Sequence, residues 1–223
     1  MPHKIKENRL ITGFVKITGW PIAMIFYKPK IYYEDKKEQG KKMPAPGIFV
    51  SNHTNLLDFP LHLCTFFSRN IRFLVAEVQF AQGKLFSWFL YKLGAIKVDR
   101  VSRDFSFIGE SLEALDNGRC IGIFPQGRIP LKDEGFIPYK PSLGYIASKT
   151  DAPIIPVYID GNYGIFKRTH IIIGKRMYLS DLDVSGLDGS AAAEAITAAV
   201  EKKTLELSEI LEKKLKNEKD KRK

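Results

Sequence analysis

Cysteine and histidine are scarce in this chain of 223 residues, which has two cysteines and four histidines. Cys64 and Cys120 lie far apart among apolar residues, which argues against a disulfide framework and a cysteine-based metal site. We expect both to be buried reduced thiols, as is usual in a cytosolic compartment. The histidines have no spacing typical of zinc ligands. We therefore predict no metal and no bound cofactor.

Acidic residues are also in deficit, with 25 Asp and Glu against 35 Lys and Arg, a net charge of +10. Such a balance indicates an anionic partner, which composition leaves open as nucleic acid, a membrane leaflet or an anionic substrate. No nucleic-acid-binding motif is recognisable, so we expect no nucleic-acid partner. The length and the 44% apolar content fit one α/β domain with appendages, or at most two small domains.

One long apolar stretch occurs near the N-terminus, Leu10 to Tyr27. It ends without an Ala-x-Ala-like cleavage site, so no secretory signal is evident. It could just cross a bilayer, but Lys16 near its centre would cost about 2.5–3.5 kcal/mol and Pro21 would kink the helix. We expect a shallow helical hairpin, broken near Trp20-Pro21, at the membrane interface. A true span and simple packing on the domain remain alternatives.

The rest of the chain alternates short runs rich in Ile and Val with segments of helix length, which predicts an α/β sheet covered on both faces. Residues 33–47 are polar, end in Pro and Gly, and are predicted to be a linker. A final helix is expected after Asp188-Gly189, with a frayed basic tail over 217–223. We divide the chain into 1–40, a membrane-associating helical segment and linker; 41–185, the α/β domain; and 186–223, the C-terminal helix and tail. The expected strands are 47–50, 71–75, 95–98, 120–124, 154–159 and 169–173, and the expected helices between them are 59–68, 83–93, 103–117 and 139–149.

The stretch FVSNHTNLLDFP, residues 49–60, places His53 and Asp58 at the mouth of an apolar segment. A helix is expected to begin between them, with Asn52 or Thr54 as its cap. Asp58 would then lie near the imidazole, fix its tautomer and make the other ring nitrogen a base that can activate a hydroxyl. A zinc site, which would need further ligands, and a structural histidine beside a capping aspartate are the alternatives.

Two further stretches place polar groups at strand ends, where open α/β sheets hold ligands. IGIFPQGRIP, residues 121–130, contains a Pro-x-Gly turn with exposed amides, and Arg128 adds a fixed cation. GAIKVDR, residues 94–100, brings Arg100 to another strand end. Together they predict a cradle for an anion.

These motifs together resemble the glycerophospholipid acyltransferase family, typified by 1-acylglycerol-3-phosphate acyltransferase. The family's Asn-His followed by four residues and Asp matches Asn52-His53 and Asp58, and its middle motif matches GAIKVDR. Its Phe-Pro-Glu-Gly motif matches residues 124–127, with Gln126 in place of the glutamate and Arg128 next. APIIPVYI, residues 152–159, resembles the last motif, and Lys140 stands in the position of the family's lysine.

The resemblance implies a mixed sheet flanked by helices, with an N-terminal membrane-associating helical segment. It implies that His53 acts as general base and that Asp58 orients it. No acyl-enzyme is implied, so neither cysteine needs a catalytic role. The substrate-binding residues that it implies are Asn52, Arg100, Phe124, Pro125, Gln126, Gly127, Arg128 and Lys140.

The implied reaction moves a fatty acyl group from acyl-CoA or acyl carrier protein, as co-substrate, to 1-acylglycerol 3-phosphate, giving phosphatidic acid. The implied partners are these donors, a lysophospholipid acceptor and anionic membrane lipid. The implied location is the cytoplasmic face of a membrane, as a peripheral or monotopic protein. Gln126 and Ile129 depart from the family pattern and leave the acceptor open. Transfer to another lysophospholipid or lipid, and a non-catalytic lipid-binding role, remain alternatives.

Overall fold

A seven-stranded sheet forms the centre of the computed structural model, which describes residues 7–39, 43, 45–99, 104–164 and 166–221. The strand order is β1-β7-β6-β2-β5-β3-β4. Neighbouring strands from β6 to β4 are parallel, whereas β7 is antiparallel to β6 and parallel to β1. The sheet is therefore mixed, as expected. The strands are β1 (Lys30–Tyr33), β2 (Gly47–Ser51), β3 (Ile71–Ala76), β4 (Ile96–Val98), β5 (Cys120–Ile123), β6 (Ile154–Ile159) and β7 (His170–Ile173).

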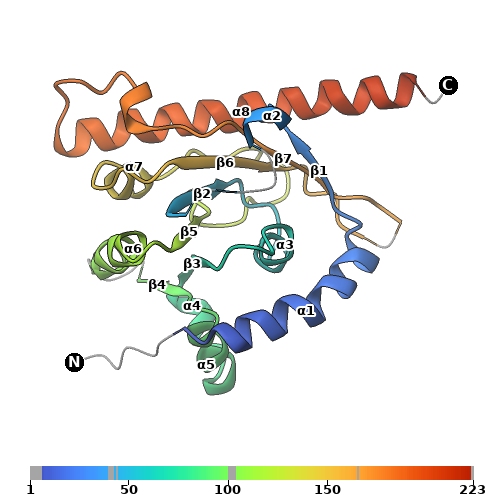
Figure 1. Ribbon diagram of the computed structural model, residues 1–223, viewed down its shortest axis with the longest axis horizontal. Helices are drawn as coiled ribbons and strands as arrows, with labels where there is room; N and C mark the ends of the chain where they lie inside the picture. The colour runs from blue at the N-terminus through green and yellow to red at the C-terminus, as the bar shows by residue number, and fades with distance from the viewer. Residues whose placement is uncertain (1–6, 40–42, 44, 100–103, 165, 222–223) are drawn as a thin grey trace.

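Helices cover both faces of this sheet because inner strands such as β2 and β5 are apolar at successive positions, so that apolar side chains project from both faces. On β2, Ile48 and Val50 join the core beneath α6 (Ser106–Asp116), α7 (Ser142–Ala147) and the first half of α8 (Gly189–Asp220). Phe49 faces the other way, towards α3 (Asp58–Thr65). Figure 1 shows α6 and α7 on one side of the strands and α3 on the other. Side chains of β2 therefore pack into the apolar cores on both faces of the sheet, and this packing fixes the position of the residues that follow the strand.

The segment predicted as a linker is more ordered than expected. Residue Tyr33 belongs to β1, and α2 (Lys36–Gln39) follows at once. The linker prediction is thus wrong for these residues, because β1 pairs along β7 and the Gln39 side chain donates from Nε2 to the Ile173 carbonyl at 3.0 Å. A short helix, α4 (Glu77–Phe80), was also not predicted, whereas α5 (Lys84–Lys92) was.

The C-terminal helix α8 continues through Asp220, so the prediction of a frayed end is wrong for residues 217–220. The reason is a contact with the first strand. Glu218 accepts a hydrogen bond from Lys30 Nζ at 2.6 Å and from the Tyr32 hydroxyl at 3.1 Å. These bonds tie the last turns of the helix to β1.

The N-terminal segment forms one helix, α1 (Arg9–Phe26), with Pro21 inside it, so the predicted hairpin is wrong. Asn8 caps its start by accepting from two backbone amides. The buried Lys16 donates to the Phe67 carbonyl at 3.2 Å, to the Asn70 side chain at 3.3 Å and to the Arg69 carbonyl. Burial lowers the pKa of Lys16. The Lys16 ammonium thus attaches α1 to the segment after α3. In a helix that spanned a membrane, the same charge would lie in lipid.

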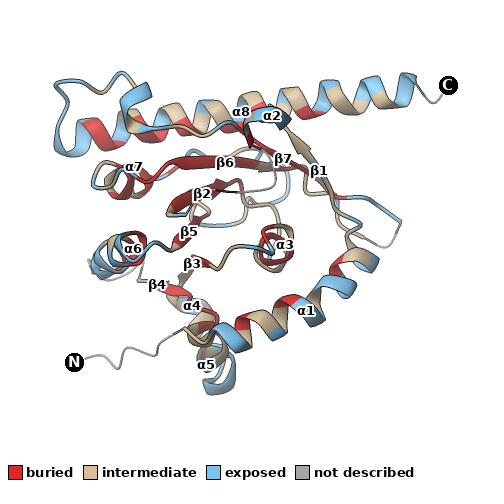
Figure 2. Ribbon diagram, viewed as in Figure 1, coloured by how far each residue is buried: buried red, intermediate tan, exposed pale blue. Residues whose placement is uncertain are grey.

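The opposite side of α1 is apolar and uncovered. By length and composition, this 18-residue helix could cross a membrane, and 17% of it is buried against the domain. Figure 2 shows β2, β6 and β7 as mostly buried, whereas α1 and α5 carry many exposed residues. The large exposed apolar side chains of α1 are Leu10, Phe14, Ile17, Trp20, Ile22, Ile25 and Phe26.

Both cysteines are buried, as expected, and neither forms a disulfide. Burial raises the pKa of Cys120 to about 11. Within the described ranges, no group of three His, Cys, Asp or Glu side chains could hold a metal ion.

Candidate active site

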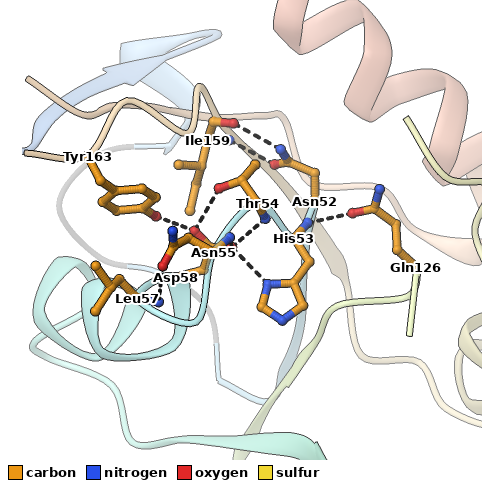
Figure 3. Close-up of polar contacts among 9 residues, drawn as sticks. All are labelled: Asn52, His53, Thr54, Asn55, Leu57, Asp58, Gln126, Ile159 and Tyr163. Atoms are coloured by element: carbon orange, nitrogen blue, oxygen red, sulfur yellow. Dashed lines mark hydrogen bonds and ion pairs between the residues drawn. The ribbon is translucent and has the colours of Figure 1, made fainter. Parts of the chain in front are cut away.

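The site is built where β2 ends and α3 begins. His53 is the second residue after the strand, and Asp58 is the first residue of the helix. Their side chains meet, with His53 Nδ1 and Asp58 Oδ2 2.8 Å apart (Figure 3). Neither Asn52 nor Thr54 caps α3, contrary to expectation, because Asp58 itself accepts from the amides of Thr54 at 2.6 Å and Asn55 at 2.9 Å. The intervening turn is therefore wrapped around the carboxylate.

Asp58 is buried, and both of its carboxylate oxygens accept hydrogen bonds. Its Oδ2 atom accepts from the imidazole and from the two backbone amides, while Oδ1 accepts from the Thr54 hydroxyl at 3.0 Å and from the Tyr163 hydroxyl. Burial alone would raise the pKa of Asp58, but the hydrogen bonds from His53, Tyr163 and the two amides outweigh it, so the pKa lies below its ordinary value. An ionised carboxylate at Nδ1 holds the proton there and leaves Nε2 as the basic nitrogen.

Tyr163 was not anticipated from the sequence. It lies in the loop between β6 and β7 and comes from a part of the chain 105 positions after Asp58. The one available signal was its place just after the end of β6, at the same edge of the sheet as His53. No motif marks it.

Asn52 and Gln126 lie behind His53 and hold the backbone around it. Asn52 exchanges two hydrogen bonds of 2.9 Å with the backbone of Ile159, which joins the end of β2 to β6. The Gln126 side-chain oxygen accepts from the His53 amide at 2.5 Å. Both side chains are buried, and as far as the described residues show, neither lines the cavity in front of His53. Gln126, which stands where the family pattern has glutamate, therefore contacts the backbone of His53 and not the cavity.

A cavity of about 530 Å³ opens in front of the imidazole. The His53 ring stacks on Phe124, with centroids 4.4 Å apart and 17° between the planes. Among the described residues, none hydrogen-bonds to Nε2, and His53 forms part of the cavity wall. The wall away from His53 is mostly apolar and comes from β3, β4, α5 and α6; it includes Phe73, Val75, Leu90, Val98 and Phe107.

The polar end of the cavity carries two cations. Gly127, Arg128 and Lys140 all line it together with His53. Gly127 has a φ of +75°, and a Cβ built there would lie 2.8 Å from Cε of Lys140, so the lysine stem lies directly over the turn. The Lys140 amide donates to the Pro125 carbonyl at 2.9 Å, which fixes this approach.

Arg128 lies at the exposed mouth of the cavity, where it makes a two-pronged ion pair with Glu134. This pairing lowers the pKa of Glu134 to about 2. Phe124 and Pro125 also line the cavity, so the structure brings five predicted substrate residues to one place: Phe124, Pro125, Gly127, Arg128 and Lys140. Arg100 lies outside the described residues.

A model of the Acyltransferase family matches residues 31–160, which is more than half of the chain. The chain belongs to the Acyltransferase family. The resemblance drawn from the motifs is therefore confirmed, and the protein is an enzyme of this class. The matched residues include β2 to β6, His53, Asp58 and the loop after β5, whereas Tyr163 lies just beyond the match.

Three similar acyltransferases are named 1-acyl-sn-glycerol-3-phosphate acyltransferase. The protein from Bacillus subtilis is 29% identical over 143 residues, 62% of this chain and 69% of its own. The chloroplastic BAT2 protein of Brassica napus is 22% identical over 209 residues, 79% of this chain and 60% of its own. The Helicobacter pylori protein is 29% identical over 121 residues, 53% of this chain and 50% of its own.

The fold matches that of a solved acyltransferase. The crystal structure of the 1-acyl-sn-glycerophosphate acyltransferase PlsC from Thermotoga maritima superposes with a TM-score of 0.64 at 22% sequence identity. The match covers 89% of this chain and 79% of that chain. The expected fold, a mixed sheet flanked by helices, is confirmed.

Proposed function

We propose that this acyltransferase moves a fatty acyl group from a thioester donor to the free hydroxyl of 1-acylglycerol 3-phosphate, giving phosphatidic acid. The observation that carries the proposal is the His53–Asp58 pair at the wall of an apolar cavity whose polar end carries Arg128 and Lys140. The names of the similar acyltransferases agree with this acceptor.

His53 acts as general base in the proposed reaction. Its Nε2 takes the proton of the acceptor hydroxyl while the hydroxyl oxygen attacks the thioester carbonyl carbon. The tetrahedral intermediate then expels the thiolate as the carbon–sulfur bond breaks, and the imidazolium returns the proton to sulfur. Asp58 stabilises the imidazolium throughout, and the stacked ring of Phe124 holds its plane. No acyl-enzyme is formed, which agrees with both cysteines being buried.

The cavity has a place for each part of the reactants. Its apolar wall suits an acyl chain, and burial of methylene groups there would supply binding energy at about 0.8 kcal/mol each. Arg128 and Lys140 are suited to an acceptor phosphate, since a guanidinium and an ammonium recognise its oxygens by charge and hydrogen bonds. The donor, acyl-CoA or acyl carrier protein, is not distinguished by these features.

Membrane contact through α1 and α5 follows from their exposed surfaces. The Asn8 amide donates to the Lys92 carbonyl at 3.0 Å, so the start of α1 adjoins the end of α5. Phe14 and Trp20 on α1 and Leu85 and Trp88 on α5 are exposed. Lys84 and Lys92 flank the aromatic residues of α5, a composition suited to an anionic interface. We propose that this side rests on the cytoplasmic leaflet, where the lipid acceptor is found.

The test of the reaction is an acceptor panel with labelled long-chain acyl-CoA. The acceptors are lysophosphatidic acid, glycerol 3-phosphate, a zwitterionic lysophospholipid and a monoacylglycerol. We expect transfer to lysophosphatidic acid, lost in a folded His53→Ala variant. Activity of His53→Ala near the parent rate would refute the base, and preference for another acceptor would refute the substrate. Inactive samples are assayed again with acyl carrier protein as donor.

Phosphate recognition is tested by Arg128→Ala. We expect a raised KM for lysophosphatidic acid and little change with a phosphate-free acceptor. Lys132→Ala, on an exposed lysine of the same loop, is the control for net charge. Equal losses with both acceptors would assign Arg128 a structural role.

Membrane contact is tested by sedimentation with anionic vesicles. The double variant Phe14→Ser, Trp20→Ser should bind less than the parent. Leu205→Ser, on an exposed leucine of α8, should bind like the parent. Unchanged binding of the α1 variant would exclude this surface.

A further inference from the structure

The Tyr163 hydroxyl bonds to the catalytic carboxylate from the side opposite the imidazole. It donates to Asp58 Oδ1, whereas His53 holds Oδ2 (Figure 3). Burial strongly raises the pKa of Tyr163, and the charge of Asp58 raises it further, so the phenol stays protonated and remains a donor. The bond is thus charge-assisted, the kind that contributes most in a buried site.

The ring of Tyr163 is held by the end of α1. It meets Tyr27, the residue that ends this helix, edge to face, with centroids 5.6 Å apart and 88° between the planes. The Tyr27 carbonyl accepts from the Thr169 amide at 2.9 Å, and the Thr169 hydroxyl donates to the Asn162 carbonyl at 2.7 Å. Tyr27 therefore contacts Tyr163 by its ring and holds the surrounding loop by its backbone.

The same loop is also pinned at its start. Asp160 accepts from the amide of Asn162 at 3.1 Å, from its side chain at 2.8 Å, and from the His170 amide at 3.0 Å. The His170 Nδ1 atom lies 2.6 Å from Asp160 Oδ2, the oxygen that also accepts from the Asn162 side chain. With both ends of the loop fixed, the position of the Tyr163 hydroxyl depends on where the loop and the end of α1 lie together.

We propose that Tyr163 is a positioning residue for the His53–Asp58 pair and that Tyr27 keeps Tyr163 in place. The position of α1 on the domain then affects the alignment of the general base. The inference rests on the proposed role of His53. With Thr54 and Tyr163 both donating to Oδ1, the carboxylate is fixed with Oδ2 towards the imidazole. Loss of one donor lets the carboxylate rotate and weakens that alignment.

Few titratable groups face the His53–Asp58 pair, so the pH dependence of the rate can test the proposal. The titratable groups that face it are His62 from α3 and Tyr163 from the β6–β7 loop, with Asp160 behind Tyr163. Tyr163 is one of the donors that keep the pKa of Asp58 low. Its removal should raise that pKa, so the acidic limb of the rate profile should move to higher pH.

The experiment is Tyr163→Phe, which keeps the ring against Tyr27 and removes the hydroxyl. We expect kcat to fall roughly tenfold, with KM for donor and acceptor within about twofold, and the acidic limb to shift upward. Tyr145→Phe on α7, outside the Asp58 network, is the matched control and should behave like the parent. A Tyr163→Phe variant with lowered Tm but parental kcat and pH profile would overturn the proposal.

A double-mutant cycle tests the part played by α1. Tyr27→Leu should lower kcat on its own and add little in the Tyr163→Phe background, because the hydroxyl that Tyr27 positions is then absent. Additive losses would overturn the link to α1. His53→Ala assayed in parallel separates the two levels: activity in that variant defeats the proposed function, whereas an inactive His53→Ala beside a parental Tyr163→Phe defeats only this inference.

Discussion

The imidazole of His53 lies flat on the phenyl ring of Phe124, at 4.4 Å and 17°, although the two residues follow different strands, β2 and β5. A second stacked ring, Phe73, supports Phe124 from β3, with centroids 5.6 Å apart. The plane of the His53 imidazole is thus set by residues of three adjacent strands, while its tautomer is set by Asp58.

Phe124→Leu removes the flat surface beneath the imidazole and keeps an apolar side chain. We expect kcat to fall by roughly tenfold, since small misalignments of a base are costly, while the fold persists. Steady-state kinetics and a thermal melt measure both. A variant with parental kcat would show that Asp58 alone orients the ring.

Gln126 offers a graded test through its bond to the His53 amide. Gln126→Leu leaves that part-buried amide without its acceptor, a cost of about 1 kcal/mol, and should reduce both stability and kcat. Gln126→Glu keeps an acceptor oxygen at the same place and should retain most activity with the same acceptor preference. A changed acceptor preference in Gln126→Glu would contradict the assignment of this side chain to His53.

His62 should make stability depend on pH. It is 1% exposed, neither ring nitrogen has a hydrogen-bond partner within the described chain, and burial lowers its pKa to about 4. The unfolded chain binds a proton near pH 6.5 and the folded chain only near pH 4, so stability should fall as the pH drops through this window. The loss by pH 4.5 is roughly 2–3 kcal/mol.

Urea unfolding at pH 7 and pH 4.5 measures this loss, and His62→Phe should reduce it, because phenylalanine has no proton to bind. The lowered pKa of Asp58 acts below this window and does not compete. An unchanged pH dependence in His62→Phe would exclude His62 as its source.

Gly144 marks the closest approach of α7 and α8. A Cβ there would lie 1.9 Å from the Ala193 carbonyl oxygen, a backbone atom of α8 that cannot yield. Gly144→Ala should destabilise the fold by about 1–3 kcal/mol or prevent expression. Gly109→Ala, in α6 with no atom within 4 Å of the new carbon, should be stabilising by about 0.5–1 kcal/mol. A neutral Gly144→Ala would mean that the two helices separate easily.

The sheet and the contact between His53 and Asp58 could be predicted because their signals are local. Runs of Ile and Val mark strands such as β2 and β6, and the spacing of His53 and Asp58 is short enough to bring them together around one turn. Strand β1 escaped prediction because its pairing partner, β7, lies far along the chain, and nothing local distinguishes KIYY from a segment leading into a linker.

The contacts that support the His53–Asp58 site could not be predicted for the same reason. Tyr163 reaches Asp58 only once β6 and β2 are paired. Gln126 was predicted to bind substrate, because a motif gives the order of residues but not the direction of a side chain. The continuous α1 depends on Lys16 finding acceptors at residues 67–70, which no local rule foresees. Periodicity indicates where elements lie, and long-range polar contacts decide how the site is held.

A charge that complements the helix dipole lies at each end of α3. Asp58 lies in its first turn, and Lys16 of α1 lies just beyond its last, opposite charges that each complement the helix dipole by typically 0.3–1 kcal/mol. A chain shortened to begin at β1, in order to remove the apolar surface of α1, would therefore lose the cation that complements the dipole of the helix carrying Asp58. Reduced activity of such a chain would report on the electrostatics of α3 as much as on its distance from the bilayer.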